Sequence, residues 1–510
     1  MTGEKLIPLA LKLSVFAMGL FLYLFITRNA PGWVQPAIMS TMALVYGIVY
    51  AITAISLLAA LRRPGDSGTN GRTNLALFAL ILLTLLLLVY VFLESAVFDY
   101  YQPLSLYDEA IAALATWWVV LIVAGTALLL KHAQGRIVPL AAMAVLALWA
   151  LATWPLAGAL QWINQPQPGD AVDFHQHVFE SGEDGYAVYR IPGLVLIPAG
   201  SALATGTRIS NDRLVAFAEA RRDGALDQGV IDLVVKISND GGRTWGEQTI
   251  VCRNEHKGLR GKCGNPAPVF DNGSGKLCLA YNLSGTEKNG RWHSGHVMYS
   301  GDGGISWEAP RQVSDDNFIF GPGKGLQKAR PPHPGRLLLP GYANGNALVM
   351  YSDDSGLNWN RGSGLPGSDE TDVAELSEGR LYLNTRHHAP IARPPEPNGR
   401  QFSLSADGGE TWSATEIDTA LTTPVCQASV LSTRSGGLLF SNPAHNRSRV
   451  NMTLRHSPDG GANWDENMLI YPGPSGYSVL AEGSDGSAYL LYENGNMSYS
   501  ERISLAVIMR

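Results

Sequence analysis

The chain has 510 residues and a formal net charge of −6 at pH 7, and this length is too great for one compact domain. The acidic balance, without a basic stripe that carries interleaved aromatic residues, argues against a nucleic-acid-binding protein. Four cysteines are too few for a disulfide scaffold, and no cysteine–histidine cluster has the spacing of metal ligands, so we expect no metal site.

The first 161 residues are overwhelmingly apolar, whereas residues 170–510 are rich in glycine and polar residues. Five apolar stretches are long enough to cross the roughly 30 Å of hydrocarbon in a bilayer as helices. They run over residues 7–27, 35–60, 75–94, 112–130 and 138–160. We therefore predict an α-helical, five-span transmembrane domain at residues 1–161, followed by a proline-containing linker at residues 162–173.

The charges between these stretches predict the orientation in the membrane. The connections after the second and fourth stretches are basic, whereas the connection after the third carries only acidic charges. Because positive connections face the cytoplasm, we expect the N-terminus there and everything after residue 160 on the exoplasmic side, which is the periplasm or cell surface in a bacterium. The stretches have almost no ionisable residues in their interior, so we interpret them as an anchor in the lipid bilayer instead of a transporter.

The second part of the chain repeats one short pattern five times, Ser-x-Asp-x-Gly-x-(Thr/Ser/Asn)-Trp. The copies begin at Ser238, Ser300, Ser352, Ser405 and Ser457, which are 62, 52, 53 and 52 residues apart. A near-constant period of this length indicates stacked structural units. We expect each aspartate to accept hydrogen bonds from a hairpin turn, each glycine to take a positive φ and each tryptophan to pack beneath the turn. These boxes are therefore architectural.

Short strand-like stretches separated by Gly, Pro, Asn and Asp occur throughout this part, for example at residues 214–217, 231–235, 379–383 and 488–492. Residues 174–510, at about 53 residues per unit, allow six units, one of which lacks the box. We predict an all-β, six-bladed β-propeller over residues 174–510. The alternating pattern at residues 502–508 predicts that the C-terminal strand closes the ring beside the segment at 174–190.

The four cysteines all lie in the propeller part. Cys252 and Cys263 are close enough in sequence to bridge a loop, and the sequence leaves this disulfide undecided. Cys278 and Cys426 are expected to be buried thiols.

A propeller carries its functional site at one end of the central channel, so the site residues are scattered along the chain. Arg190 begins a predicted strand, Arg386 ends another, and Arg447 and Arg449 stand at the start of a third. Converging guanidinium groups are costly unless an anion joins them. A carboxylate is the matching anion because arginine donates two parallel hydrogen bonds to it, so these segments suit a sugar acid.

Three groups of motifs resemble those of the exo-α-sialidases (neuraminidases), in particular the lysosomal-type branch and its bacterial relatives. They are Arg-Ile-Pro at 190–192 followed by Ala-Phe-Ala-Glu-Ala-Arg at 216–221 and the boxes, the stretches at 440–445 and 449–455, and Pro-Gly-Pro-Ser-Gly-Tyr-Ser at 472–478. The resemblance covers residues 174–510 and none of the apolar part. It implies a cofactor-independent glycoside hydrolase that removes terminal α-linked sialic acids from glycoproteins, glycolipids or oligosaccharides with retention.

The resemblance also implies roles for single residues. Arg190, Arg386 and Arg449 would bind the sialic acid carboxylate, and the Arg-Val-Asn match selects Arg449 over Arg447. The Pro-Gly-Pro-Ser-Gly-Tyr match makes Tyr477 the nucleophile. A neutral phenol suits an anomeric carbon that bears a carboxylate, because a charged aspartate or glutamate would be repelled.

A phenol with a pKa near 10 needs a base. Residue chemistry leaves Glu370, Asp372 and Glu375 as candidates, and the resemblance selects Glu370, which follows Asp369 and lies sixteen residues before Arg386.

The remaining roles fall on the loop at residues 221–229 and on one later acid. The loop offers Asp223 and Asp227 as the acid/base, and the resemblance favours Asp227. Arg221 resembles a residue that lines the sugar pocket, and Glu493 resembles the acid that orients the first arginine of the triad.

Two alternatives remain beside a membrane-anchored sialidase. A non-catalytic glycan-binding or adhesion propeller would share the boxes, although the joint presence of the nucleophile, base, acid and arginine triad argues against it. A hydrolase of a related nonulosonic acid, or a trans-sialidase, would keep the same triad. The fused N-terminal part departs from the family and bears on location and regulation more than on chemistry.

Overall fold

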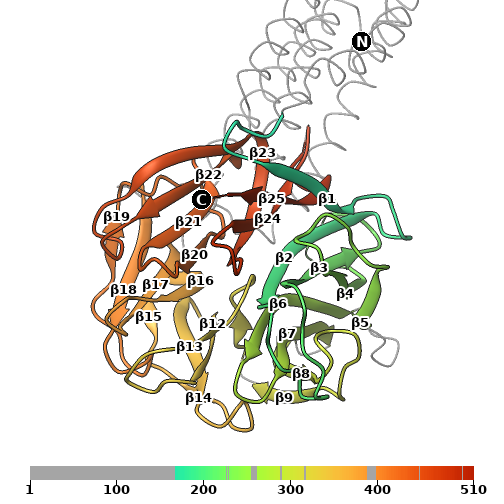
Figure 1. The fold of residues 1–510 in the computed structure, drawn as a ribbon, viewed down its shortest axis with the longest axis horizontal. Coiled ribbons are helices and arrows are strands. Elements are labelled where there is room, and N and C mark those ends of the chain that lie inside the picture. Colours follow the sequence, from blue (N-terminus) through green and yellow to red (C-terminus); the bar gives the residue numbers. More distant parts are fainter. Residues whose placement is uncertain are drawn as a thin grey trace, which may run out of the picture. The chain divides into compact units, whose positions relative to one another are not determined.

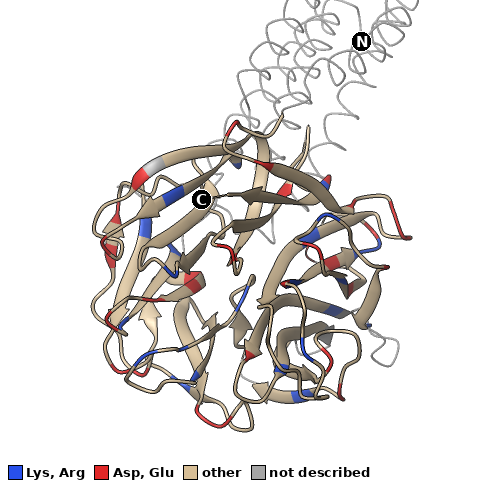
Figure 2. Ribbon diagram, in the orientation of Figure 1, with Lys and Arg blue, Asp and Glu red and all other residues tan. Residues whose placement is uncertain are grey.

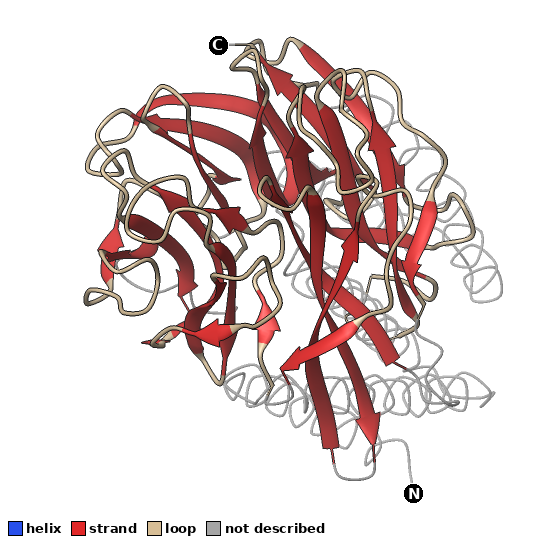
Figure 3. Ribbon diagram, turned by 60° about the horizontal axis from the view of Figure 1, so that its bottom comes forward, coloured by secondary structure: helices blue, strands red, loops and turns tan. Residues whose placement is uncertain are grey.

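The computed structural model describes residues 167–509, except 226, 228, 254–260, 288–289, 315–316, 388–397, 447 and 497. The predicted transmembrane domain at 1–161 and the beginning of the linker lie outside the described residues. Within the described part, no helix has the length and apolar character needed to span a bilayer. The regular elements of this part are strands, as Figure 3 shows by colour.

In the described part, the strands divide into six blades that follow one another around a ring (Figure 1). Blades one to three contain β2 (Val188–Ile197), β3 (Arg213–Arg221), β4 (Ile231–Ser238) and β5 (Thr249–Cys252); β6 (Gly261–Asp271), β7 (Lys276–Glu287), β8 (Gly290–Ser300) and β9 (Arg311–Ser314); and β10 (Ile319–Phe320), β11 (Leu326–Gln327), β12 (Leu337–Ala343), β13 (Asn346–Ser352), β14 (Asn360–Arg361) and β15 (Leu365–Pro366). In blade three the first and the last strand are each split into two short pieces.

Blades four to six complete the ring. They contain β16 (Ser368–Glu375), β17 (Leu381–His387), β18 (Arg400–Ser405) and β19 (Glu416–Asp418); β20 (Ser429–Ser432), β21 (Leu438–Pro443), β22 (Val450–Ser457) and the first half of β23 (Asp465–Glu482); and the second half of β23, β24 (Ala488–Asn494), β25 (Arg502–Ile508) and β1 (Phe174–Glu180). The long strand β23 pairs with β22 up to Pro474 and with β24 from Ser475 onward, so it passes from blade five into blade six.

The ring closes as predicted, because β1 pairs antiparallel with β25 from Phe174 opposite Val507 to Glu180 opposite Arg502. The core lies between neighbouring blades. Between blades one and six, for example, Leu194 and Ala216 meet Val479 and Leu491, all with no exposed surface. Burying such apolar surfaces is the main favourable contribution to folding.

The five boxes form the predicted staples. In the first, the Gly242 N–H donates to Ser238 Oγ (2.9 Å), the Thr244 N–H donates to Asp240 Oδ1 (2.9 Å), and Gly242 has a φ of 83°. Trp245 packs against a core cluster. The other four boxes repeat the serine and aspartate bonds, the positive φ and the tryptophan packing.

The staples also explain why six blades carry five boxes. Each box joins the third strand of a blade to its outermost strand, as in the turn between β4 and β5. In blade six these two strands are β25 and β1, which come from opposite ends of the propeller sequence. No hairpin connects them, so this blade has no turn for a box to staple.

The structure decides the cysteine question. A disulfide joins Cys252 in β5 to Cys263 in β6 and thereby links blades one and two. Cys278 and Cys426 are buried free thiols, as expected.

Candidate active site

The eight predicted site residues come from four blades. Blade one contributes Arg190, Arg221 and the β3–β4 loop with Asp227; blade four contributes Glu370 and Arg386; blade five contributes Arg449, directly before β22; blade six contributes Tyr477 and Glu493. Figure 2 shows basic and acidic residues around the centre of the ring as well as on its rim. The contacts below bring the eight residues into one cluster.

Four strand pairs that carry the site have a register shift where they reach it. The shifts lie between Arg190 and Gly193, between Ser368 and Thr371, between Val450 and Met452, and between Ser475 and Ser478. A β-bulge bends the strand and re-aims its side chains, so neighbouring residues need not point to opposite faces. These bulges turn the strand ends toward the common site.

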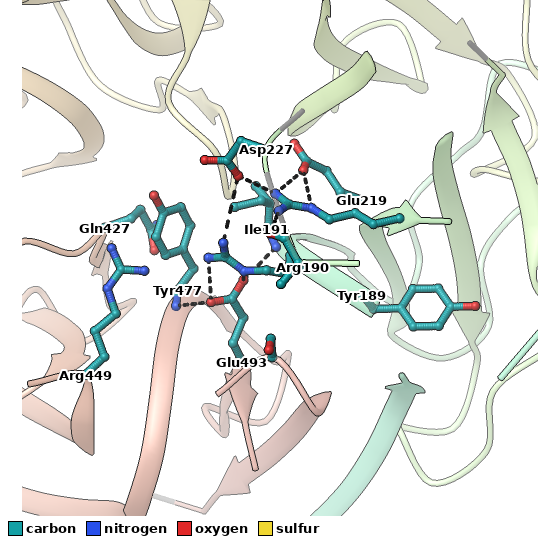
Figure 4. Close-up of polar contacts among 12 residues, drawn as sticks. Tyr189, Arg190, Ile191, Glu219, Asp227, Gln427, Arg449, Tyr477 and Glu493 are labelled. Carbon is teal, nitrogen blue, oxygen red and sulfur yellow. Dashed lines mark hydrogen bonds and ion pairs between the residues drawn. The ribbon is translucent and has the colours of Figure 1, made fainter. Parts of the chain in front are cut away.

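Glu493 is completely buried and organises one side of the site (Figure 4). Its Oε1 accepts from Arg190 Nε (3.0 Å) and from the Ile191 N–H (2.8 Å). Its Oε2 accepts from Arg190 Nη2 (3.3 Å) and from the Tyr477 N–H (2.9 Å). Ile191 has a φ of 56°, which is unfavourable for a β-branched residue, and the bond to Glu493 holds this conformation.

Arg386 is held by two consecutive carboxylates at the bulge in β16. Its Nε and Nη2 donate to the two oxygens of Asp369 at 2.7 and 2.9 Å, and its Nη1 lies 2.7 Å from Glu370 Oε2. The same Nη1 lies 3.5 Å from Tyr477 Oη. The bidentate pair with Asp369 fixes the orientation of the guanidinium group.

The Tyr477 hydroxyl donates a short hydrogen bond to Glu370 Oε1, and both side chains are buried. Burial raises the pKa of Glu370, and the neighbouring Asp369 adds to the rise while Arg386 opposes it. Burial and the charge of Glu370 likewise raise the pKa of Tyr477. A carboxylate with a raised pKa is a better proton acceptor, which is the property that a base needs.

Arg449 and Arg190 flank the ring of the same tyrosine. The Cζ atoms of Arg449 and Arg190 lie 5.3 and 5.4 Å from the Tyr477 ring centroid, and Arg449 Nη2 donates to the Val425 carbonyl (2.8 Å). With Arg386 at the hydroxyl, the three predicted triad arginines therefore converge on one phenol. The alternative arginine at 447 lies outside the described residues.

Asp227 stands at the open side of the cluster, with a side chain that is 67% exposed. Its Oδ1 accepts from Arg221 Nη2 (2.8 Å) and lies 4.0 Å from Arg190 Nη1. Loss of hydration in this cluster would raise the pKa of Asp227, but Arg221 and Arg190 outweigh it and hold that pKa well below its usual range. Asp223, the other candidate in this loop, is exposed.

The other two candidate bases have structural partners instead. Asp372 accepts from Lys324 Nζ and Ser429 Oγ, both at 2.8 Å. Glu375 accepts from Lys328 Nζ (2.6 Å). Both carboxylates thus tie blades together, and Glu370 is the one of the three that reaches Tyr477.

Sequence reasoning gave no role to Asp369, which holds Arg386, or to two further residues of the cluster, Glu219 and Tyr499. Glu219 accepts from Arg221 Nη2 (2.7 Å) and from the Asn265 N–H (3.0 Å), so it holds Arg221 in place. Its two-residue spacing from Arg221 on a strand puts both on one face and could have revealed it. Tyr499, between β24 and β25, packs against two triad arginines, and its local sequence gives no signal of this.

Two further observations concern the surroundings. Within the part of the chain that the structure describes, no group of three or more His, Cys, Asp or Glu residues could hold a metal ion. A groove of about 630 Å³ lies on blade one, and none of the eight predicted site residues lines it. Its lining includes Tyr186, Arg222, Lys236 and Gln248.

Known proteins resemble this chain over the propeller. A family model described as a BNR repeat-like domain matches residues 212–504. A sialidase from Micromonospora viridifaciens is 30% identical over 385 residues, covering 68% of this chain and 57% of the relative. A sialidase from Bacteroides fragilis is 29% identical over 359 residues, covering 62% of each chain. Sialidase-3 from Rattus norvegicus is 25% identical, covering 65% of this chain and 93% of the relative.

The comparison with solved structures agrees. The Hadza microbial sialidase Hz136 superposes with a TM-score of 0.56 at 25% identity, covering 66% of this chain and 68% of that one. This chain spans 57% and 62% of the length of the two bacterial relatives named above. The match of the family model to more than half of the chain, together with these sialidase relatives, shows that the chain belongs to the exo-α-sialidase family with BNR repeats.

Proposed function

We propose that this protein is a membrane-anchored, retaining exo-α-sialidase that hydrolyses terminal α-linked sialic acids from glycoproteins, glycolipids or oligosaccharides. The observation that carries the proposal is the convergence of Arg190, Arg386 and Arg449 on the phenol of Tyr477, which is hydrogen-bonded to Glu370. This arrangement suits a ligand with a carboxylate on the carbon that is attacked. A propeller that only bound glycans would have no use for the paired phenol and carboxylate.

The arginines serve to bind and orient the substrate. Each hydrogen bond from a guanidinium to the sialic acid carboxylate contributes roughly 1.5–3 kcal/mol. Because Glu493 and Asp369 already hold two of the three arginines through paired bonds, little side-chain entropy is lost on binding. The bound carboxylate places the anomeric carbon beside the Tyr477 hydroxyl.

In the first half of the reaction, Tyr477 Oη attacks the anomeric carbon and its proton passes to Glu370. Once Glu370 is neutral, the negative charge that raised the pKa of Tyr477 is gone, and Arg386 and Arg449 stabilise the developing phenolate. The bond to the leaving oxygen breaks, and that oxygen takes a proton from Asp227. The product is a glycosyl–tyrosine intermediate through an oxocarbenium-like transition state.

Asp227 must carry a proton for this step, although Arg221 and Arg190 lower its pKa in the free site. The substrate carboxylate neutralises part of the Arg190 charge, so binding raises the proton affinity of Asp227. In the second half, Asp227 takes a proton from water, the water attacks the anomeric carbon, and Glu370 returns its proton to Tyr477. Two inversions at one carbon give retention.

Assay of the full-length chain with an α-sialoside, followed by proton NMR of the released sugar, tests this proposal. We expect free sialic acid to appear first as the α-anomer. No turnover by the folded chain, or first appearance of the β-anomer, would contradict the proposal. Transfer to an added acceptor, or an anhydro sugar in place of free sialic acid, would assign the chain to trans-sialidases instead.

The membrane anchor and the exoplasmic location of the propeller are part of the same proposal. The five apolar stretches of residues 7–160 and their basic connections support it. The Cys252–Cys263 disulfide adds support, because such bonds persist in oxidising compartments. A reporter fused after residue 165 is expected to be active on the exoplasmic side, and activity in the cytoplasm would overturn this topology.

A further inference from the structure

Tyr499 stands next to two members of the arginine triad. It is 4% exposed and belongs to the segment between β24 and β25. The Cζ atoms of Arg190 and Arg449 lie 5.1 and 5.3 Å from the centroid of its ring. Both distances are within the range of cation–π attraction, which is stronger where water is excluded.

The same two guanidinium groups also face the ring of Tyr477, at 5.4 and 5.3 Å. Arg190 and Arg449 are therefore each close to two phenol rings. Two buried cations repel each other before an anion arrives. Glu493 compensates Arg190 through paired hydrogen bonds, and Arg449 donates to the carbonyl of Val425.

An aromatic ring suits this position better than another carboxylate would. An additional acid beside Arg190 and Arg449 would compete with the substrate carboxylate for their N–H groups. A phenol ring attracts cations through its face and leaves these donors available. Burial raises the pKa of Tyr499 to about 12, so its hydroxyl stays neutral at physiological pH.

Tyr499 is also packed against the strand that carries the nucleophile. A Cβ atom at Gly476 would lie 2.9 Å from Tyr499 Cδ2 and 2.1 Å from Glu493 Oε2. Only glycine at 476 therefore allows the ring and the buried acid to approach the backbone directly before Tyr477. This contact fixes the ring relative to Tyr477 as well as to the arginines.

We propose that Tyr499 is a positioning residue that holds Arg190 and Arg449 at the spacing needed to receive the substrate carboxylate. This inference rests on the proposed sialidase function. The ring face of Tyr499 contributes to the affinity for the substrate carboxylate, and Tyr499 takes no part in proton transfer.

The test compares Tyr499→Phe and Tyr499→Leu in the full-length chain. We would measure kcat, KM for an α-sialoside, and inhibition by a 2,3-unsaturated sialic acid and by its uncharged carboxamide. For Tyr499→Leu we expect the carboxylate inhibitor to bind about 10- to 30-fold more weakly. The affinity of Tyr499→Leu for the carboxamide should change by less than about 3-fold. The affinities of Tyr499→Phe for both inhibitors should stay near those of the unmodified protein.

Tyr471→Leu is the matched control. Tyr471 is a buried tyrosine of β23 that lies in a core cluster and donates to the Gly495 carbonyl. This variant should lower the melting temperature without changing the preference for the carboxylate over the carboxamide. Equal losses for both ligands in Tyr499→Leu would show that the ring only fills space. A Tyr499→Phe variant that binds the carboxylate inhibitor as weakly as Tyr499→Leu would show that the hydroxyl, and not the ring face, carries the effect. Either result would overturn the inference.

A second series keeps the inference testable if Tyr499→Leu does not fold. Mono-, di- and trifluorophenylalanine at position 499 preserve the shape of the ring and progressively weaken its negative face. We expect carboxylate affinity to fall with each added fluorine, and an unchanged affinity would overturn the inference. If the unmodified chain neither binds nor hydrolyses sialosides, the proposed function fails. If the chain is active but substitutions at position 499 leave its affinity for the carboxylate inhibitor unchanged, only this inference is refuted.

Discussion

Replacement of Tyr477 by phenylalanine is expected to lower kcat for an α-sialoside by about 10⁴- to 10⁶-fold, as removal of a nucleophile does in other enzymes. The change removes the single oxygen that we expect to bond to the anomeric carbon. The ring would keep its packing against Ile191 and Cys426, and Glu370 would keep its ion pair with Arg386. The fold should therefore survive, at a cost of about 1–3 kcal/mol for the lost hydrogen bond.

Tyr471→Phe provides the control for this prediction. Tyr471 lies in the same strand, is also buried and donates its hydroxyl to the Gly495 carbonyl. The Tyr471→Phe variant should lose about as much stability as Tyr477→Phe, while its kcat stays within a few-fold of that of the unmodified chain. Intact-mass measurement after rapid acid quench should detect a glycosylated species for the unmodified chain and none for Tyr477→Phe. A folded Tyr477→Phe chain that kept more than about 1% of kcat would exclude Tyr477 as the nucleophile.

Replacement of Glu493 is expected to have the largest effect on stability. Glu493→Ala would leave the buried charge of Arg190 without its carboxylate and two N–H groups, those of Ile191 and Tyr477, without an acceptor. Removing one partner of a buried ion pair costs about 3–5 kcal/mol. We expect a loss of this size in denaturant unfolding, together with loss of kcat/KM, because Arg190 and the bulge that carries it lose their orientation.

Two further variants serve as controls: one tests the charge of Glu493 apart from its shape, and the other tests a different acid in the same strand pair. Glu493→Gln keeps the volume and one acceptor oxygen but loses the charge, so it should cost less stability than Glu493→Ala while kcat/KM still falls. Glu482→Ala, near the end of the same strand pair, removes an acid that accepts from the Arg434 N–H (2.9 Å) and lies 3.9 Å from Nε of the half-exposed Arg434 guanidinium. The ion pair should contribute less than about 1 kcal/mol, so we expect this variant to lose less stability than Glu493→Ala. Equal stability of Glu493→Ala and Glu482→Ala would refute the organising role of Glu493.

Several features of the fold could be predicted from the sequence because they depend on local chemistry. The boxes are an example: Ser238, Asp240 and Gly242 make their turn within a few residues, so spacing alone reveals it. The alternating pattern of residues 502–508 likewise predicted a closing strand, which the structure pairs with β1. Motifs resembling those of sialidases pointed to eight site residues, which the structure places in one cluster.

The choice among nearby acids could not be made from chemistry alone. Glu370, Asp372 and Glu375 all lie in β16, and a regular strand sends alternate side chains to opposite faces. The register shift between Ser368 and Thr371 breaks this alternation and lets Asp369 and Glu370 reach Arg386 together. A bulge is a property of the pairing between strands, and the sequence of one strand does not display it.

By itself, the sequence determined the repeating hairpins, the all-β ring and the family, because each depends on short patterns that recur or match within a few residues. Tertiary structure alone decided that Cys252 bonds Cys263 and that Tyr499 packs on Arg190. It also showed that Glu370, which the family resemblance had selected, is the acid that meets Tyr477. These contacts join residues that closure of the ring brings together. Their geometry comes from how the blades are bent and packed, which no local pattern encodes.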